Sequence, residues 1–168
     1  LAAAEPPGPV HFDLSAKDAA APTEPAPPAT PAAPRIPDDA ALTAAADLVA
    51  AARRPVLVVG HQCRTGHRAT AANRLCVALG GPAMTTYKAK GVVSEDGPHF
   101  VGLFTNAKLD HAVLRRADLI VFCGVDPVEM IPGTWPHDVP VVVRNRRPHR
   151  GQRGISDRHR RRVRLAGR

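Results

Sequence analysis

The most constraining stretch of the chain is a run of four aliphatic residues between a proline and a glycine, the sequence PVLVVG at residues 55–60. The run has no alternation of apolar and polar residues, which is typical of a strand buried on both faces in a parallel sheet. Helical patterns flank it over residues 38–54 and 65–79. This order puts Gly60 at the turn from a parallel strand into a helix, where α/β proteins commonly bind a ligand phosphate.

The rest of the chain continues this alternation of strands and helices. Further strands are predicted over residues 82–86, 118–124 and 139–143, with a loop over 87–105 and a short helix over 106–116. Strands that alternate with helices are typical of parallel sheets with right-handed crossovers. We therefore predict an α/β fold, a Rossmann-like three-layer sandwich with a mostly parallel sheet.

The composition fits one domain with extensions. The 168 residues are 44% hydrophobic but only 4% aromatic, so the core has to be built from Ala, Val and Leu. No apolar run approaches the roughly 18 residues that a membrane span needs, and no signal-peptide pattern opens the chain. The three cysteines form no CxxC pair, and Cys76 and Cys123 have the positions of small core residues. A reducing cytoplasm is the expected compartment. The chain begins with Leu1 rather than Met, which favours a fragment.

Two segments are expected before the α/β domain. Residues 1–18 contain a short alternating strand over residues 9–14, with Val10, Phe12 and Leu14 on one side. Residues 19–37 are rich in Ala and Pro. Because proline favours extended polyproline geometry, we predict a semi-rigid linker there. The strand then belongs to a different unit from the α/β domain, which is predicted over residues 38–143.

The excess basic charge is confined to the last segment, residues 144–168. This segment has eleven Arg and one acidic residue, Asp157, and therefore a net charge of +10. The whole chain has a net charge of +8, so the rest of it has −2. It has no apolar period and is predicted to be disordered. A nucleic-acid-binding arm is one interpretation, but no aromatic residues are interleaved for base stacking. We favour a change of reading frame after Val143, because translation of G/C-rich DNA in the wrong frame gives an Arg-rich amino-acid sequence. That hypothesis fails if neither shifted frame continues with strands and helices.

Candidate ligand-binding residues follow the strands predicted at residues 55–60, 82–86 and 118–124. The carboxyl ends of parallel strands meet at one edge of the sheet, where hydroxyl groups could bind phosphates and an Asp could accept a hydrogen bond from a ribose or adenine. The candidates are Gly60, His61, Thr85, Thr86, Gly124 and Asp126. A solvated loop and an ordinary Asp-Pro turn explain the same residues without a ligand. His61 and His67 are six residues apart, a poor spacing for a metal, and neither a metal site nor a catalytic triad is predicted.

Several segments taken together resemble one family of enzymes. The most specific is the sequence TYKAKGVVSEDGP at residues 86–98, followed by Gly102, which resembles a "T…KGV.PEDHP…G" segment. In the family this segment is followed by a strand and a turn, which residues 117–129 resemble. The Pro-rich linker precedes the segment at the spacing seen in the family. The family is that of thiamine-diphosphate-dependent enzymes of the acetolactate synthase type. The resemblance covers residues 5–143 and stops after the last predicted strand.

The resemblance implies a fragment of an enzyme with three domains. In this family one domain binds the pyrimidine of thiamine diphosphate, a central one has a Rossmann-like sheet, and a third binds the diphosphate through Mg²⁺. This chain would hold the last strand of the first domain, the linker and the central domain. The catalytic Glu would lie upstream and the metal-binding Gly-Asp-Gly…Asn segment downstream, so no catalytic or metal-binding residue is expected here. The implied partners are the two other domains and further copies of the full-length enzyme.

Some members of the family bind FAD or ADP on the central domain. Carried over by position, the six candidates named above would contact that ligand. However, His61, Gln62 and Cys63 stand where such members have glycines, and their side chains would crowd a pyrophosphate. Two other functions stay open: a stand-alone Rossmann-like module for FAD, ADP or NAD, and a basic interaction protein. The resemblance favours a central domain of a carboligase or decarboxylase of 2-oxo acids, inactive as this chain alone.

Overall fold

The computed structural model describes residues 9–27 and 38–145, and the backbone of residues 162–166. The chain divides into two compact units, Leu1–Pro34 and Arg35–Arg168. No helix in the described part is long and apolar enough to cross a membrane.

The described part of the first unit has one short helix, α1 (Ala16–Ala19), whose N-terminus is capped by the Ser15 hydroxyl. The strand predicted around Val10, Phe12 and Leu14 is not formed. Residues 9–15 have no regular secondary structure, and these three side chains are all more than half exposed. A strand needs a neighbour to satisfy its backbone groups, and no described segment pairs with this one. That residues 1–18 end a preceding domain stays a prediction.

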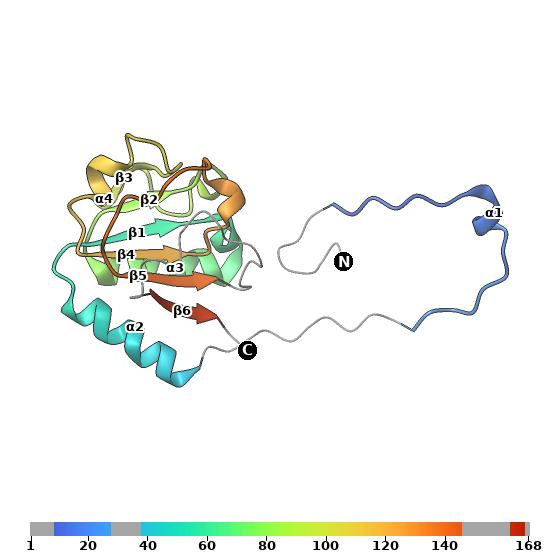
Figure 1. Ribbon diagram of the computed structural model, residues 1–168, viewed down its shortest axis with the longest axis horizontal. Coiled ribbons are helices and arrows are strands. Elements are labelled where there is room, and N and C mark those ends of the chain that lie inside the picture. The colour runs from blue at the N-terminus through green and yellow to red at the C-terminus, as the bar shows by residue number, and fades with distance from the viewer. Residues whose placement is uncertain (1–8, 28–37, 146–161, 167–168) are drawn as a thin grey trace. The chain divides into compact units, whose positions relative to one another are not determined.

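The second unit is built on a parallel six-stranded sheet (Figure 1). The strand order is β3-β2-β1-β4-β5-β6, and every pair of neighbouring strands is parallel. The strands are β1 (Pro55–Val59), β2 (Ala83–Thr85), β3 (Phe100–Leu103), β4 (Leu119–Cys123), β5 (Val141–Asn145) and β6 (Arg162–Ala166). The predicted α/β fold with a mostly parallel sheet is confirmed, with the run at residues 55–60 at its centre.

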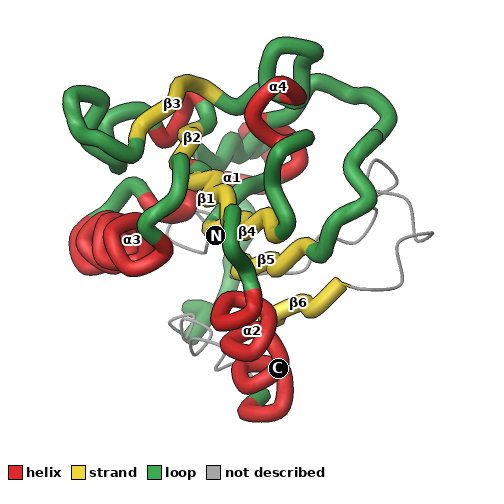
Figure 2. Tube along the Cα trace, turned by 90° about the vertical axis from the view of Figure 1, so that its left-hand side faces the viewer, coloured by secondary structure: helices red, strands yellow, loops and turns green. Residues whose placement is uncertain are grey.

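Helices cover both faces of the sheet and make three layers (Figure 2). They are α2 (Asp39–Ala51) and α3 (Gly66–Leu79) on one face and α4 (His111–Leu114) on the other. Every residue of β1 is buried. Leu57 and Val59 belong to the apolar cluster under α2 and α3, whereas Val56 and Val58 belong to the cluster around Phe104 on the opposite face. A strand with two buried faces explains why its sequence shows no alternation.

The ends of the two long helices follow from single residues. Asp38 caps α2, because its carboxylate accepts a 3.1 Å hydrogen bond from the backbone N–H of Ala40. Gly80 ends α3 in the left-handed conformation, with φ +63°. That conformation favours glycine. Both boundaries lie close to the predicted ones.

Two predictions for residues 87–116 are wrong. Strand β3 lies in the segment that was predicted to be a loop. It is a partly exposed edge strand of only four residues, FVGL, and Gly102 with φ +128° interrupts its apolar run. The helix predicted over residues 106–116 is reduced to α4. Asn106 has φ +68°, which no helix accommodates, and the carboxylate of Asp110 instead holds the backbone N–H groups of Thr105 and Ala107.

The last predicted segment is also more ordered than expected. Strand β5 ends at Asn145, two residues beyond the predicted domain boundary, and residues 162–166 form β6 beside it. The sequence of β6, RVRLA, alternates Arg with apolar residues, a strand pattern that the many Arg residues concealed. Backbone pairing does not depend on side-chain charge. The predicted disorder is therefore wrong for these residues, and residues 146–161 lie outside the described part.

Candidate functional site

The predicted site residues lie at the carboxyl edge of the sheet, around the end of β1. The strand order changes direction there, because β2 lies on one side of β1 and β4 on the other. Such a switch point is the usual place for a ligand in an open α/β sheet. Gly60 follows β1, Thr85 ends β2, and Gly124 follows β4.

The centre of this edge is a carboxylate that the sequence analysis did not identify, that of Glu129. Its residue closes the single turn η3 (Pro127–Glu129) after β4, and only 2% of its surface is exposed. The hydroxyl of Thr86 donates to Oε1 at 2.6 Å. The backbone N–H of Asp126 donates to Oε2 at 2.9 Å, and that of His61 lies 3.2 Å from both oxygens. The carboxylate thus fills the space between the ends of β1, β2 and β4.

The ring of His61 completes the set of donors. Its Nδ1 lies 2.8 Å from Glu129 Oε2, close enough for an ion pair when the ring is protonated, and only a protonated Nδ1 can donate to that oxygen. Burying a carboxylate is costly unless donors satisfy both oxygens. Here two backbone N–H groups, one hydroxyl and one imidazole do so. Glu129 is therefore a stable part of the fold at this edge.

Two glycines let the turns approach each other closely. A Cβ on Gly60 would lie 2.3 Å from the carbonyl oxygen of Gly124. The φ of Gly60 is −108°, a value that any residue adopts, so this position needs glycine for space. Gly124 has φ +67°, and a Cβ there would lie 2.7 Å from Cys63 Sγ. Both glycines serve the packing of the turns, and the predicted contact of Gly60 with a phosphate stays a prediction.

Of the remaining candidates, Asp126 belongs to the cluster around Glu129 and Thr85 does not. Asp126 is 4% exposed and caps η3, accepting from the backbone N–H of Val128 at 3.1 Å. Thr85 is fully buried, and its hydroxyl finds no hydrogen-bond partner in the described part of the chain. The structure thus brings His61, Thr86 and Asp126 together on Glu129, and leaves Thr85 outside this cluster.

The residue that sequence reasoning missed has a recognisable signal. Asp126 and Glu129 form a reciprocal capping box, with Pro127 at the first position of the turn. Asp126 was predicted as a ligand contact, with an ordinary Asp-Pro turn as the alternative, and Glu129 was assigned no role in the site. The loop that begins at Tyr87 is less organised for binding, since Lys90 is exposed and pairs with Glu95 at 2.8 Å.

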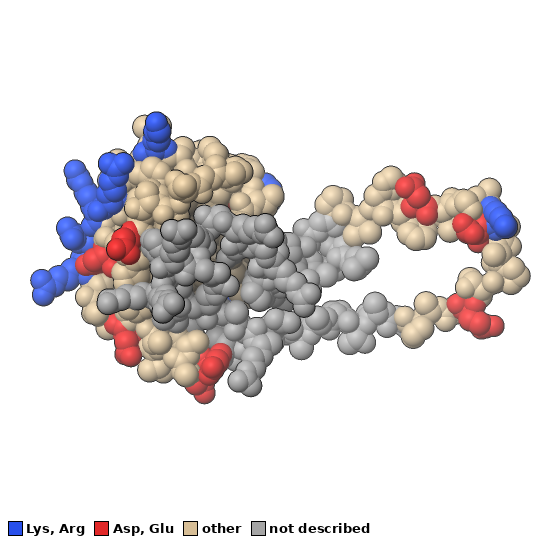
Figure 3. Space-filling view, in the orientation of Figure 1, with Lys and Arg blue, Asp and Glu red and all other residues tan. Residues whose placement is uncertain are grey.

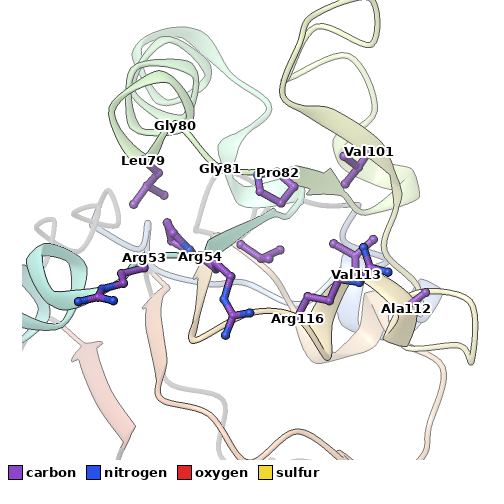
Figure 4. A pocket seen from close by; sticks show the side chains of 12 residues that line it. Arg53, Arg54, Leu79, Gly80, Gly81, Pro82, Val101, Ala112, Val113 and Arg116 are labelled. Carbon is purple, nitrogen blue, oxygen red and sulfur yellow. The ribbon is translucent and has the colours of Figure 1, made fainter.

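A cavity of about 620 Å³ lies at the other edge of the sheet, where β1 begins (Figure 4). Its lining is mostly apolar, with Arg53, Arg54 and Arg116 as the charged residues. Figure 3 shows Lys and Arg side chains gathered at the edge from which the strand arrows of Figure 1 start. The predicted site residues do not line this cavity. In the described part of the chain, no group of three His, Cys, Asp or Glu side chains is placed to hold a metal ion.

Residues 42–155 match the protein family described as "Thiamine pyrophosphate enzyme, central domain". The match continues past Val143, so the expectation that the family pattern stops there is wrong.

Curated proteins also match the chain in sequence, each over a part of its own length. Acetolactate synthase of Bacillus subtilis (strain 168) is 33% identical over 101 residues, which cover 58% of this chain and 18% of the relative. A Pseudomonas aeruginosa protein named "Probable 2-ketoarginine decarboxylase AruI" is 31% identical over 125 residues, covering 73% of this chain and 22% of that protein. The chain therefore spans about a fifth of the length of these relatives.

Solved structures share the fold. The crystal structure of benzoylformate decarboxylase from Polynucleobacter necessarius superposes with a TM-score of 0.62 and 24% identity, covering 88% of this chain and 29% of the decarboxylase. At this identity the likeness establishes the common architecture.

Proposed function

The chain belongs to the family of thiamine pyrophosphate enzyme central domains, and on that premise we propose that it is the scaffold domain of a thiamine-diphosphate- and Mg²⁺-dependent enzyme. The proposed enzyme is a carboligase or decarboxylase of 2-oxo acids, of the acetolactate synthase type. Its catalytic groups lie in the pyrimidine-binding and diphosphate-binding domains. We place it in the cytoplasm as a homo-oligomer when full-length.

The observation that carries the scaffold role is the carboxylate of Glu129. In α/β domains that bind nucleotides, backbone N–H groups at the switch point hold the phosphates. Here the N–H groups of His61 and Asp126 donate to Glu129 instead. A phosphate at this edge would meet a buried negative charge and would have to displace it, which is unfavourable. FAD, ADP and NAD therefore do not fit this edge.

Thiamine diphosphate and Mg²⁺ likewise lack a binding set in the described residues. At the carboxyl edge, Asp126 and Glu129 are engaged in the capping box. Asp110, beyond the end of β3, accepts from the backbone N–H groups of Thr105 and Ala107. Mg²⁺ needs oxygen ligands with free positions around it. The proposal therefore assigns the cofactor to the neighbouring domains and assigns no reaction step to this chain.

Titration of the purified chain with ADP, FAD and NAD tests the scaffold role against that of a nucleotide module. We expect calorimetry to show no heat of binding for any of the three nucleotides. The variant Glu129→Ala, which lacks the carboxylate at this edge, is titrated for comparison. Micromolar binding of a nucleotide by the unmodified chain would contradict the scaffold role and assign the chain a nucleotide-binding role. Turnover of pyruvate by the chain with thiamine diphosphate and Mg²⁺ would contradict the absence of catalytic groups.

A further inference from the structure

Two of the three cysteines are in contact at the carboxyl edge of the sheet. Cys63 Sγ lies 3.6 Å from Cys123 Sγ, and it also lies 3.4 Å from the carbonyl oxygen of Cys123. Cys123 is the last residue of β4, and Cys63 ends η1 (His61–Cys63), the turn after β1. The two residues are far apart in sequence, so this contact is a product of the fold.

Backbone hydrogen bonds, which do not involve the thiols, hold the segments that carry the two cysteines next to each other. The N–H of Gly60 donates to the carbonyl oxygen of Cys123 at 2.8 Å, and the N–H of Gln62 donates to that of Gly124 at 3.1 Å. Residue 124 has no side chain, and a Cβ there would lie 2.7 Å from Cys63 Sγ. The turn after β1 is therefore fixed against the end of β4, with the thiols facing each other.

The two thiols differ in accessibility and in acidity. Cys63 is buried, whereas Cys123 is half-buried at the edge of the sheet. The hydrogen bond from Cys63 and the nearby guanidinium of Arg144 lower the pKa of the Cys123 thiol. The same hydrogen bond and burial raise the pKa of the Cys63 thiol. Cys123 is thus the nucleophile of the pair, and Cys63 keeps its proton.

We propose that Cys63 and Cys123 form a dithiol site that reacts with hydrogen peroxide and closes to an intramolecular disulfide. The Cys123 thiolate attacks one peroxide oxygen, the O–O bond breaks, and a sulfenic acid forms while hydroxide leaves. Cys63 sulfur then attacks the Cys123 sulfur, the S–O bond breaks, and the Cys63 proton leaves with the oxygen in water. Two thiols are oxidised, and one peroxide is reduced to two waters.

The geometry is suited to the second step. A disulfide bond is about 2 Å long, so the sulfur atoms have to approach by about 1.5 Å from their present contact. Rotation of the two side chains moves the sulfur atoms while the backbone hydrogen bonds stay in place. The third cysteine, Cys76, is buried on α3 and has no cysteine contact in the described part of the chain. Burial raises the pKa of its thiol, so Cys76 stays reduced.

Peptide mapping of the full chain tests the proposal. The three cysteines fall in three different tryptic peptides, residues 54–64, 75–88 and 117–144. The chain is treated with hydrogen peroxide, alkylated with iodoacetamide, digested and analysed by mass spectrometry without reduction. We expect peptide 54–64 joined to peptide 117–144 with the loss of two hydrogen atoms, peptide 75–88 alkylated, and a monomer on a non-reducing gel. Dithiothreitol should restore both free peptides.

Two variants provide controls. Cys76→Ser should form the same cross-link at the same rate as the unmodified chain. Cys63→Ser should form no cross-link and should leave a Cys123 sulfenic acid that dimedone traps. Cross-links that contain Cys76, disulfides between two chains, or complete alkylation of all three thiols after peroxide treatment would each overturn the proposal.

Discussion

The hydroxyl of Thr86 donates a 2.6 Å hydrogen bond to Oε1 of Glu129, and both side chains are buried. The bond joins the end of β2 to the turn after β4 across the intervening strand β1. His61 binds the same carboxylate from the turn after β1. The edge where related architectures bind ligands is thus closed by one internal carboxylate.

Thr86→Val should lower the free energy of unfolding by about 2 kcal/mol, because it removes a donor from a buried charged group. The neighbouring residue offers a matched control. Thr85 is equally buried, but its hydroxyl has no partner in the described part of the chain. Thr85→Val should therefore leave stability unchanged or raise it by up to about 1 kcal/mol. Urea denaturation followed by circular dichroism measures both, and equal losses would contradict the assignment.

Glu129→Ala should destabilise the chain and create an anion site at the same place. The backbone N–H groups of His61 and Asp126 lose their acceptor, and two convergent N–H groups are a common phosphate-binding arrangement. We expect a loss of about 2–4 kcal/mol, because buried donors are left unpaired. Inorganic pyrophosphate should raise the melting temperature of this variant more than that of the unmodified chain. Equal shifts would show that Glu129 does not occupy an anion position.

The sequence predicted the architecture well and the site only in part, for physical reasons that particular residues illustrate. Strand β1 was predictable, because burial on both faces leaves an unbroken apolar run. Strand β3 was missed although its sequence, FVGL, is mostly apolar, because it is only four residues long and contains Gly102. The six candidate residues lie at the edge of the sheet that strand order alone predicted. Glu129 was missed because its role depends on donors from three turns that meet only after folding. The structure gives Gly60 a packing role, because a Cβ there would meet the backbone of Gly124, and its contact with a phosphate stays a prediction.

Gly60→Ala should destabilise the chain by more than about 3 kcal/mol, because the new Cβ would lie 2.3 Å from the carbonyl oxygen of Gly124, and backbone must move to relieve the contact. Gly66 provides the comparison. It has φ +48° with open space around its Cβ position, so Gly66→Ala carries only the conformational cost, about 1–2 kcal/mol. Thermal unfolding of the two variants measures the difference. A smaller loss for Gly60→Ala than for Gly66→Ala would show that the two turns are not rigidly packed.

Two buried histidines are in contact at the start of α4. His111 Nδ1 lies 2.7 Å from His137 Nε2, and both residues are at most 9% exposed. Burial, together with the charges of His111 and Arg115, lowers the pKa of His137 to about 4. In the unfolded chain a histidine has a pKa of about 6.5, so between these two values the unfolded state binds more protons than the folded state. Stability is therefore fully present above pH 6.5 and falls as the pH drops towards 4, by on the order of 2–3 kcal/mol.

Replacement of the titrating ring checks this pH dependence. His137→Phe removes the proton-binding group and keeps an aromatic ring next to Trp135, whose ring centroid lies 4.7 Å from that of His137. Its free energy of unfolding should vary less between pH 6.5 and 4 than that of the unmodified chain. His67, which is exposed on α3, is the matched control, and His67→Gln should keep the full pH dependence. An equally steep loss of stability in His137→Phe would assign the acid sensitivity to other groups.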